Sequence, residues 1–250
     1  MTTKHFLNLR DLSNQDILNI LDRAIERKSQ KQKEKTLIGS KLGLIFEKPS
    51  TRTRISFESG ILNLGGNAIF MSSSDLQLSR GEPVSDTAKV ASSMLDVIAL
   101  RVDKHETLDM FAANSSVPVI NALSDLSHPC QILADLMTFK ENSVSELEKV
   151  CWIGDGNNVC NSYIEASKIL DFELSIYCPK EYSPDPSFLN YAKQNSSFAN
   201  SREEAAKGAD IITTDVWVSM GDEKTKERAF EGYFVDTDLI ENTGKKSIFL

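Results

Sequence analysis

Strand-length apolar runs alternate with helix-length segments along almost the whole chain of 250 residues. Runs such as LGLIFE (42–47), VIAL (97–100) and VCWI (150–153) have the length of buried strands. The segments between such runs place apolar residues at helical spacing and are long enough to cross over a sheet. Parallel strands need crossovers of this kind. The alternation therefore predicts an α/β protein with parallel sheets flanked by helices.

The predicted elements fall into two sets on either side of a polar stretch, 141–149. The first set has strands at 42–47, 67–71, 97–100 and 117–120, and helices at 14–28, 51–64, 85–96, 107–113 and 128–139. The second set has strands at 150–153, 173–178, 209–214 and 247–250, a helix at 159–170, helical turns at 187–193 and 202–207, and a charged helix at 222–230. Because the pattern restarts, we expect two domains, residues 1–144 and 145–250.

Charge and hydropathy exclude some functions. The net charge is −8, and no basic block is present that could neutralise a nucleic-acid backbone. No apolar run approaches membrane-spanning length, and the N-terminal MTTKHFLNLRDLS lacks the apolar core of a signal peptide. We therefore expect no nucleic-acid partner, no membrane segment and a cytoplasmic location.

Cysteine and histidine spacing points the same way. The cysteines form no C-x-x-C pair, and the histidines are far apart in the sequence. These residues are Cys130, Cys151, Cys160 and Cys178, and His5, His105 and His128. Reduced, mostly buried thiols in a cytosolic protein fit this pattern, and a metal site is not expected.

The stretch 42–66 predicts an anion site. A strand-length run ends at Pro49, Ser50 can cap the helix that follows, and the hydroxyls and guanidinium of Thr51, Arg52 and Thr53 lie in its first turn. Free backbone N–H groups and the helix dipole favour an anion at this position. Arg52 and Arg54 are two residues apart and cannot both face one phosphate. The alternative is an ordinary helix cap with solvated arginines.

Four other segments should lie near the carboxyl ends of strands, where open α/β sheets bind ligands. They are Arg101, His128–Gln131, Gly154–Asn158 and Asp215–Met220. Each has an ordinary alternative: a surface ion pair for Arg101, a helix cap for His128 and for Asp215, and core packing for Trp217 and Met220. The turn GDGNN also resembles a dinucleotide-binding turn, but Val159 stands where the third glycine should be.

Taken together, these segments resemble one family. KPSTRTR (48–54) is similar to the carbamoyl-phosphate signature of the aspartate/ornithine carbamoyltransferase family, and HPCQ (128–131) to its H-P-x-Q segment. GDGNN (154–158) and DVWVSMG (215–221) resemble motifs of the ornithine branch, and DLQLSRGEPVSDTA (75–88) resembles its inter-subunit loop. The resemblance covers nearly the whole chain.

The resemblance implies a two-domain trimer that needs no cofactor or metal and acts in arginine metabolism. It implies transfer of a carbamoyl group from carbamoyl phosphate to the δ-amine of L-ornithine, giving L-citrulline and phosphate. Residues implied to bind carbamoyl phosphate are Ser50, Thr51, Arg52, Thr53, Arg101, His128, Pro129, Cys130 and Gln131, with Gln77 reaching the neighbouring subunit's site. Arg52, Arg101 and His128 would be catalytic. Asn158, Asp215, Ser219 and Met220 would bind ornithine.

The chain departs from the family pattern at its end. The family's His-Cys-Leu-Pro segment should follow Leu250. We therefore expect a second domain that lacks its C-terminal part, and reduced activity. Three alternatives stay open: a carbamoyltransferase for another amine such as putrescine or an acylated ornithine, a non-catalytic carbamoyl-phosphate-binding protein, and a dinucleotide-dependent oxidoreductase.

Overall fold

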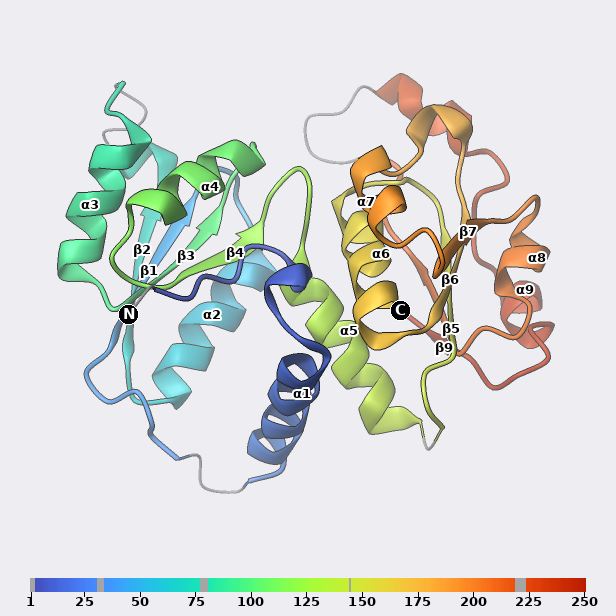
Figure 1. The fold of residues 1–250 in the computed structure, drawn as a ribbon, viewed down its shortest axis with the longest axis horizontal. Helices are drawn as coiled ribbons and strands as arrows, with labels where there is room; N and C mark the ends of the chain where they lie inside the picture. Colours follow the sequence, from blue (N-terminus) through green and yellow to red (C-terminus); the bar gives the residue numbers. More distant parts are fainter. Residues whose placement is uncertain (1–2, 31–33, 77–80, 144, 219–223) are drawn as a thin grey trace. The chain divides into compact units, whose positions relative to one another are not determined.

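The computed structural model describes residues 3–30, 34–76, 81–143, 145–218 and 224–250. They form two compact units, each built on one parallel sheet (Figure 1). Unit 1 comprises Met1–Leu12 and Leu18–Cys130, and unit 2 comprises Ser13–Ile17 and Gln131–Leu250. The predicted fold class, α/β with two parallel sheets flanked by helices, is confirmed. The division at residues 144 and 145 stays a prediction.

The sheet of unit 1 has the order β2-β1-β3-β4. Its strands are β1 (Lys41–Phe46), β2 (Asn67–Ser72), β3 (Val97–Arg101) and β4 (Val119–Leu123). In the register, Phe46 of β1 pairs with both Ser72 and Arg101. The carboxyl ends of β1, β2 and β3 therefore lie at one edge of the sheet.

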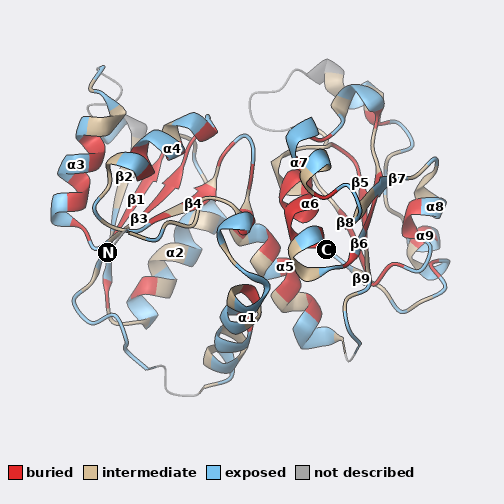
Figure 2. Cartoon of the chain, viewed as in Figure 1, coloured by how far each residue is buried: buried red, intermediate tan, exposed pale blue. Residues whose placement is uncertain are grey.

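Helices cover both faces of this sheet. They are α2 (Thr51–Asn63), α3 (Val84–Met94) and α4 (His105–Asn114), while α1 (Asn14–Ser29) is shared between the units. Alternate strand residues face opposite sides: Ile45 and Ile98 pack in the cluster with α3 and α4, whereas Leu44 packs with Ile61 of α2. Because both faces are buried (Figure 2), the strands read as continuous apolar runs.

The sheet of unit 2 has the order β7-β6-β5-β8-β9. Its strands are β5 (Lys149–Ile153), β6 (Glu173–Tyr177), β7 (Ser196–Phe198), β8 (Ile211–Thr214) and β9 (Ile248–Phe249). Its helices are α5 (Pro129–Asn142), α6 (Asn158–Leu170), α7 (Pro186–Tyr191), α8 (Arg202–Ala206) and α9 (Thr237–Glu241). Ile153 pairs with Tyr177 and with Thr214, so the loops after β5, β6 and β8 start side by side.

Some elements differ from the sequence prediction. The charged helix expected at 222–230 is present over Lys224–Phe230 as a 3-10 helix, and residues 222 and 223 lie outside the described residues. Strand β7 and helix α9 were not predicted, since β7 has three residues and α9 has five, too few to show a periodicity. Other 3-10 turns are Leu9–Asp11, Ser73–Asp75 and Lys180–Tyr182. No helix in the described ranges is long and apolar enough to cross a membrane.

Candidate active site

The N-terminus of α2 in unit 1 presents donors to solvent. Ser50 is its N-cap, and the Ser50 side chain accepts a hydrogen bond from Thr53 N at 3.4 Å. The first turn contains no acidic residue, and Thr51 and Arg52 are exposed. Within the part of the chain that the structure describes, Arg52 makes no ion pair. The backbone N–H groups, the helix dipole and Arg52 therefore make the α2 N-terminus electropositive, as the predicted anion site requires.

Two neighbouring cations are already engaged. The Arg54 Nε atom lies 2.9 Å from Glu58 Oε1, and its guanidinium lies 3.7 Å from the centroid of the Phe70 ring. Lys48 pairs with Asp103 at 2.9 Å. Arg54 thus points along its own helix and across β2. Of the two arginines in the signature, Arg52 is the one available to a ligand.

Arg101 is the last residue of β3, and its side chain is only 8% exposed. Its carbonyl accepts a hydrogen bond from Glu47 N at 2.8 Å, which ties it to the loop that leads into α2. Its buried Nε has no hydrogen-bond partner among the described residues. Burial lowers the pKa of the guanidinium, and Asp103 opposes this. A buried cation with an unused donor raises the free energy of the folded state unless an anion binds to it.

His128 stands just before α5, close enough to Arg101 for their charges to interact. Burial, and secondarily the Arg101 charge, lower the pKa of His128 to about 4. The imidazole is therefore neutral at pH 7 and can donate one N–H without adding a second positive charge. The structure thus brings Arg101 and His128 together.

Pro129 and Cys130 form the first turn of α5. Pro129 is buried and suits the first helical position, where no N–H is needed. The Cys130 thiol donates to Asn121 O at 3.4 Å, and burial raises its pKa to about 12. Cys130 is therefore a protonated packing residue and not a nucleophile.

Gln131, one turn after His128, belongs to a hydrogen-bond chain in unit 2. Its Nε2 donates to Asp135 Oδ1 at 2.9 Å, and the Tyr163 hydroxyl donates to Asp135 Oδ2 at 2.8 Å. Asp135 and Tyr163 were not predicted as site residues. The spacing of Gln131 and Asp135 by four residues on a predicted helix was the available signal.

The turn 154–158 follows β5. Gly154 has a φ of +131°, and a Cβ on Gly156 would lie 2.3 Å from Pro184 N. Both glycines therefore serve the tight path of the turn. Asn157 caps α6 by accepting from Val159 N at 3.0 Å and Cys160 N at 3.2 Å. Asn158 is the first residue of that helix.

Asp215, which follows β8, is oriented by the same turn. Its Oδ2 accepts from Asn157 Nδ2 at 2.8 Å, and its Oδ1 accepts from Val216 N at 2.7 Å. The structure therefore brings the Gly154–Asn158 turn and Asp215 together, as expected for neighbouring strand ends. The predicted residues Gln77, Ser219 and Met220 lie outside the described residues.

A buried ion pair in unit 2 was missed by sequence reasoning. Lys226 Nζ lies 2.6 Å from Asp155 Oδ2, with side chains 14% and 8% exposed. The ammonium also lies 5.0 Å from the centroid of the Tyr182 ring. The two charges are 71 residues apart in the sequence, so no local pattern indicates the pairing.

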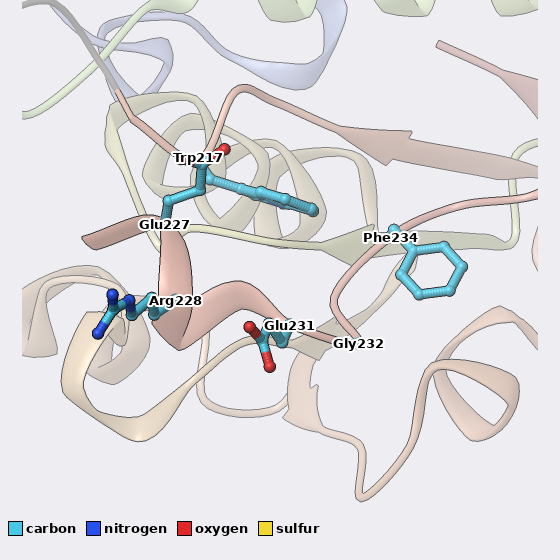
Figure 3. A pocket seen from close by; sticks show the side chains of 6 residues that line it. All are labelled: Trp217, Glu227, Arg228, Glu231, Gly232 and Phe234. Carbon is cyan, nitrogen blue, oxygen red and sulfur yellow. The ribbon is translucent and has the colours of Figure 1, made fainter. Parts of the chain in front are cut away.

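An open cleft of about 510 Å³ lies beside Trp217 in unit 2 (Figure 3). Its lining residues are Trp217, Glu227, Arg228, Glu231, Gly232 and Phe234. None of them is a residue that the sequence assigned to substrate binding. The Trp217 Nε1 donates to Tyr233 O at 3.1 Å, and its ring is parallel to Phe230 within 9° at 6.2 Å. Trp217 is therefore fixed by this hydrogen bond and by the stacked Phe230 ring, and it is half-buried at the edge of the cleft.

No three His, Cys, Asp or Glu side chains within the described ranges are placed to hold a metal ion. The polar groups at the strand ends are instead cations and N–H donors in unit 1, and amides with a carboxylate in unit 2. Such a pair of units defines a class: two-unit α/β proteins whose polar side chains gather at the carboxyl ends of parallel strands, where this fold class binds small ligands.

Comparison with known proteins specifies the class further. The model of the aspartate/ornithine carbamoyltransferase carbamoyl-P binding domain matches residues 4–141, and that of the Asp/Orn binding domain matches residues 147–250. The chain belongs to the aspartate/ornithine carbamoyltransferase family.

The similar proteins are ornithine carbamoyltransferases. The chain is 51% identical to the one from Acinetobacter baumannii (strain AYE), over 96% of this chain and 81% of that protein. Among solved structures, the anabolic ornithine carbamoyltransferase from Campylobacter jejuni superposes with a TM-score of 0.92 at 46% identity, over 99% of this chain and 85% of that one. The Pyrococcus furiosus enzyme gives 0.92 at 38% identity, over 99% and 84%.

Proposed function

We propose that this chain transfers the carbamoyl group of carbamoyl phosphate to the δ-amino group of L-ornithine, giving L-citrulline and phosphate in arginine biosynthesis. The observation that carries the proposal is Arg101, a buried cation whose Nε has no partner among the described residues. It lies next to a neutral His128 and one hydrogen bond from the loop that leads into α2. A small, doubly charged anion with a carbonyl group fits such a set of donors.

In this proposal, Ser50, Thr51, Arg52 and Thr53 hold the phosphate through their hydroxyls, the guanidinium and the N–H groups of the first turn of α2. Arg101 and His128 donate to the carbonyl oxygen of the carbamoyl group. Pro129, Cys130 and Gln131 line its other side. Residues 1–144 form the carbamoyl-phosphate-binding domain.

Residues 145–250 form the ornithine-binding domain. Asp215, held by Asn157, receives the α-ammonium of ornithine, and Asn158 contributes its amide to the amino-acid end. Ser219 and Met220 complete this set. We further propose a cytoplasmic homotrimer without cofactor or metal, in which Gln77 binds carbamoyl phosphate in the neighbouring subunit's site.

The chemistry follows from these positions. The neutral δ-amine attacks the carbamoyl carbon, and a C–N bond forms as charge develops on the carbonyl oxygen. Arg101 and His128 stabilise that oxyanion, each donor contributing about 2–4 kcal/mol in sites of this kind. The C–O bond to phosphate then breaks, its electron pair leaves with the phosphate, and the phosphate takes up the proton that the amine releases, giving hydrogen phosphate. Arg52 and the helix N-terminus stabilise the leaving phosphate.

The test is citrulline formation by the purified 250-residue chain from carbamoyl phosphate, with ornithine, putrescine or aspartate as acceptor. Ornithine-dependent product is expected. Product formed only with putrescine would show that the acceptor is another amine and not ornithine. Carbamoyl phosphate binding without any product would identify a non-catalytic binding protein and contradict the proposal.

A further inference from the structure

The carboxylate of Asp135 is buried in unit 2 and receives two hydrogen bonds. It is 8% exposed and lies on α5, four residues after Gln131. The Gln131 amide nitrogen donates to one carboxylate oxygen at 2.9 Å, and the Tyr163 hydroxyl donates to the other at 2.8 Å. The side chain is therefore fixed from two elements, α5 and α6.

Tyr163 is itself fixed in the core. It is fully buried, its ring packs at 5.9 Å from that of Trp152, and its hydroxyl also hydrogen-bonds the Thr213 side chain of β8. A chain of hydrogen bonds thus runs from the sheet through Tyr163 and Asp135 to the exposed amide of Gln131. A network anchored in this way holds its last member in one orientation.

The hydrogen bonds to the Asp135 carboxylate determine which way the Gln131 amide is turned. Burial raises the pKa of Asp135, and the hydrogen bonds from Tyr163 and Gln131 oppose this. Both carboxylate oxygens accept in the structure, so Gln131 turns its Nε2 toward Asp135 and its Oε1 away. Gln131 is exposed at this end. The group that it offers to a ligand at this fixed position is therefore an acceptor, which recognises an N–H donor.

We propose that Asp135 is a positioning residue, which holds the Gln131 amide so that Oε1 accepts a hydrogen bond from the –NH₂ group of carbamoyl phosphate. This inference rests on the proposed function. It assigns to Asp135, which touches no substrate, the selection of a carbamoyl over an acyl group. Acetyl phosphate has the same phosphate and carbonyl but carries a methyl group in place of –NH₂, and it leaves the Gln131 acceptor unpaired.

The test compares the dissociation constants of carbamoyl phosphate and acetyl phosphate, measured by isothermal titration, in the wild type and in Asp135→Asn. Asparagine has the same shape and can still accept from Tyr163, but it presents an –NH₂ to Gln131. The Gln131 amide then reverses and points its own –NH₂ outward. We expect the wild type to prefer carbamoyl phosphate about tenfold, the size of one hydrogen bond with a fixed partner, and Asp135→Asn to lose this preference.

A second variant supplies a rescue. In Asp135→Asn combined with Gln131→Glu, the asparagine donates to one glutamate oxygen and leaves the other as an outward acceptor, with net charge unchanged. The preference for carbamoyl phosphate should return. Asp210→Asn is the control, because Asp210 is also buried, accepts from Glu148 N and Lys149 N, pairs with Lys245, and is not part of the Gln131–Asp135–Tyr163 chain. It should lower the melting temperature and keep the preference.

An unchanged preference in Asp135→Asn, with a lower melting temperature like that of Asp210→Asn, would reduce Asp135 to a structural role and overturn the inference. If Asp135→Asn does not fold, Gln131→Met takes its place, because it removes the acceptor and leaves Asp135 in position. Retained preference in Gln131→Met overturns the inference equally. A wild-type chain that forms citrulline but shows no preference contradicts this inference alone. A chain that does not bind carbamoyl phosphate contradicts the proposed function as well.

Discussion

The strand-end loops of the two units differ in how their polar groups are satisfied. In unit 1, the buried Arg101 Nε has no partner and Arg52 makes no ion pair among the described residues. In unit 2, Asp215 is bonded to Asn157, and Asp155 to Lys226. Unit 1 therefore presents donors that an anion can complete. In unit 2 both carboxylates already accept hydrogen bonds, Asp155 from an ammonium and Asp215 from neutral N–H groups.

This difference indicates what each half contributes. Unpaired donors fixed in place are what an electrostatic catalyst needs, since they cost no reorganisation when charge develops. Paired groups hold a loop in position, but their hydrogen-bonding atoms are already engaged within the protein. Substitutions in unit 1 should therefore reduce turnover more than stability, and substitutions in unit 2 the reverse.

The largest expected effect is that of Arg101→Ala. Removing an oxyanion donor costs about a hundredfold or more in turnover, and Arg52→Ala should reduce turnover by a similar factor. The melting temperature of Arg101→Ala should fall little, because the substitution removes a buried charge whose Nε makes no hydrogen bond among the described residues and whose desolvation outweighs its attraction to Asp103. Citrulline assays and thermal unfolding of the same preparations measure both quantities.

Arg54→Ala is the matched control for Arg52→Ala. Arg54 stands two residues further on and is bound to Glu58 and stacked on Phe70. Its side chain is 46% exposed, so its pair with Glu58 contributes little to stability. It should keep near-normal turnover. Comparable losses in Arg52→Ala and Arg54→Ala would show that α2 as a whole, and not one guanidinium, is required.

The next effect concerns the buried pair of unit 2. Lys226→Met leaves the Asp155 charge in place without its ammonium, which should lower the free energy of unfolding by about 3 kcal/mol. Combining it with Asp155→Asn should recover part of that loss, because the buried negative charge is then removed together with its ammonium. Urea unfolding of the single and double variants measures the coupling. Additive losses would contradict the assignment of a buried, directly paired couple.

A smaller effect is expected for Asn157→Ala. The substitution removes the N-cap of α6 and one hydrogen bond to the Asp215 carboxylate, with a loss of about 1.5 kcal/mol in unfolding free energy. The KM for ornithine should rise about tenfold while carbamoyl phosphate binding is kept. Asp215→Asn should show the same separation. A parallel loss of both affinities in isothermal titration would place Asn157 and Asp215 outside the ornithine half.

The same contrast explains how far the sequence could be interpreted. Arg101 could be placed because a strand-length run ends at it, and strand ends are where ligands bind. The cap at Ser50 and the turn before Asn157 follow from local chemistry in the same way. Position along the chain is enough to place such residues.

Pairing across the fold is not visible in local patterns. Asp155 and Lys226 meet only because the loop after β5 and the 3-10 helix lie on the same unit, and Tyr163 reaches Asp135 across two helices. Nor could the sequence tell that Arg101 would be buried with a free Nε while Arg54 would be stacked on Phe70. In the sequence alone, nothing distinguishes Arg101, whose Nε lacks a partner, from Arg54, which has two partners.

The smallest expected effect is the pH response of His128. Burial lowers its folded-state pKa to about 4, against an ordinary value near 6.5. Between these values the unfolded chain binds a proton that the folded chain does not. Stability is therefore full above pH 6.5 and is lost as the pH falls toward 4, by at most about 1 kcal/mol between pH 6.5 and 5.5.

His128→Asn should remove this part of the pH dependence, measured by urea unfolding at pH 7.5, 6.5 and 5.5. The kcat of the wild type should not fall near pH 6.5, because the His128 imidazole is neutral throughout this range. His5→Asn is the control for the kcat profile. Burial also lowers the pKa of His5, but His5 accepts a hydrogen bond from Val119 N and takes no part in the proposed chemistry. A kcat profile that falls near pH 6.5 in the wild type and flattens in His128→Asn would show that His128 titrates there. It would then be accessible to solvent, and its imidazole would not act as a neutral donor throughout this pH range.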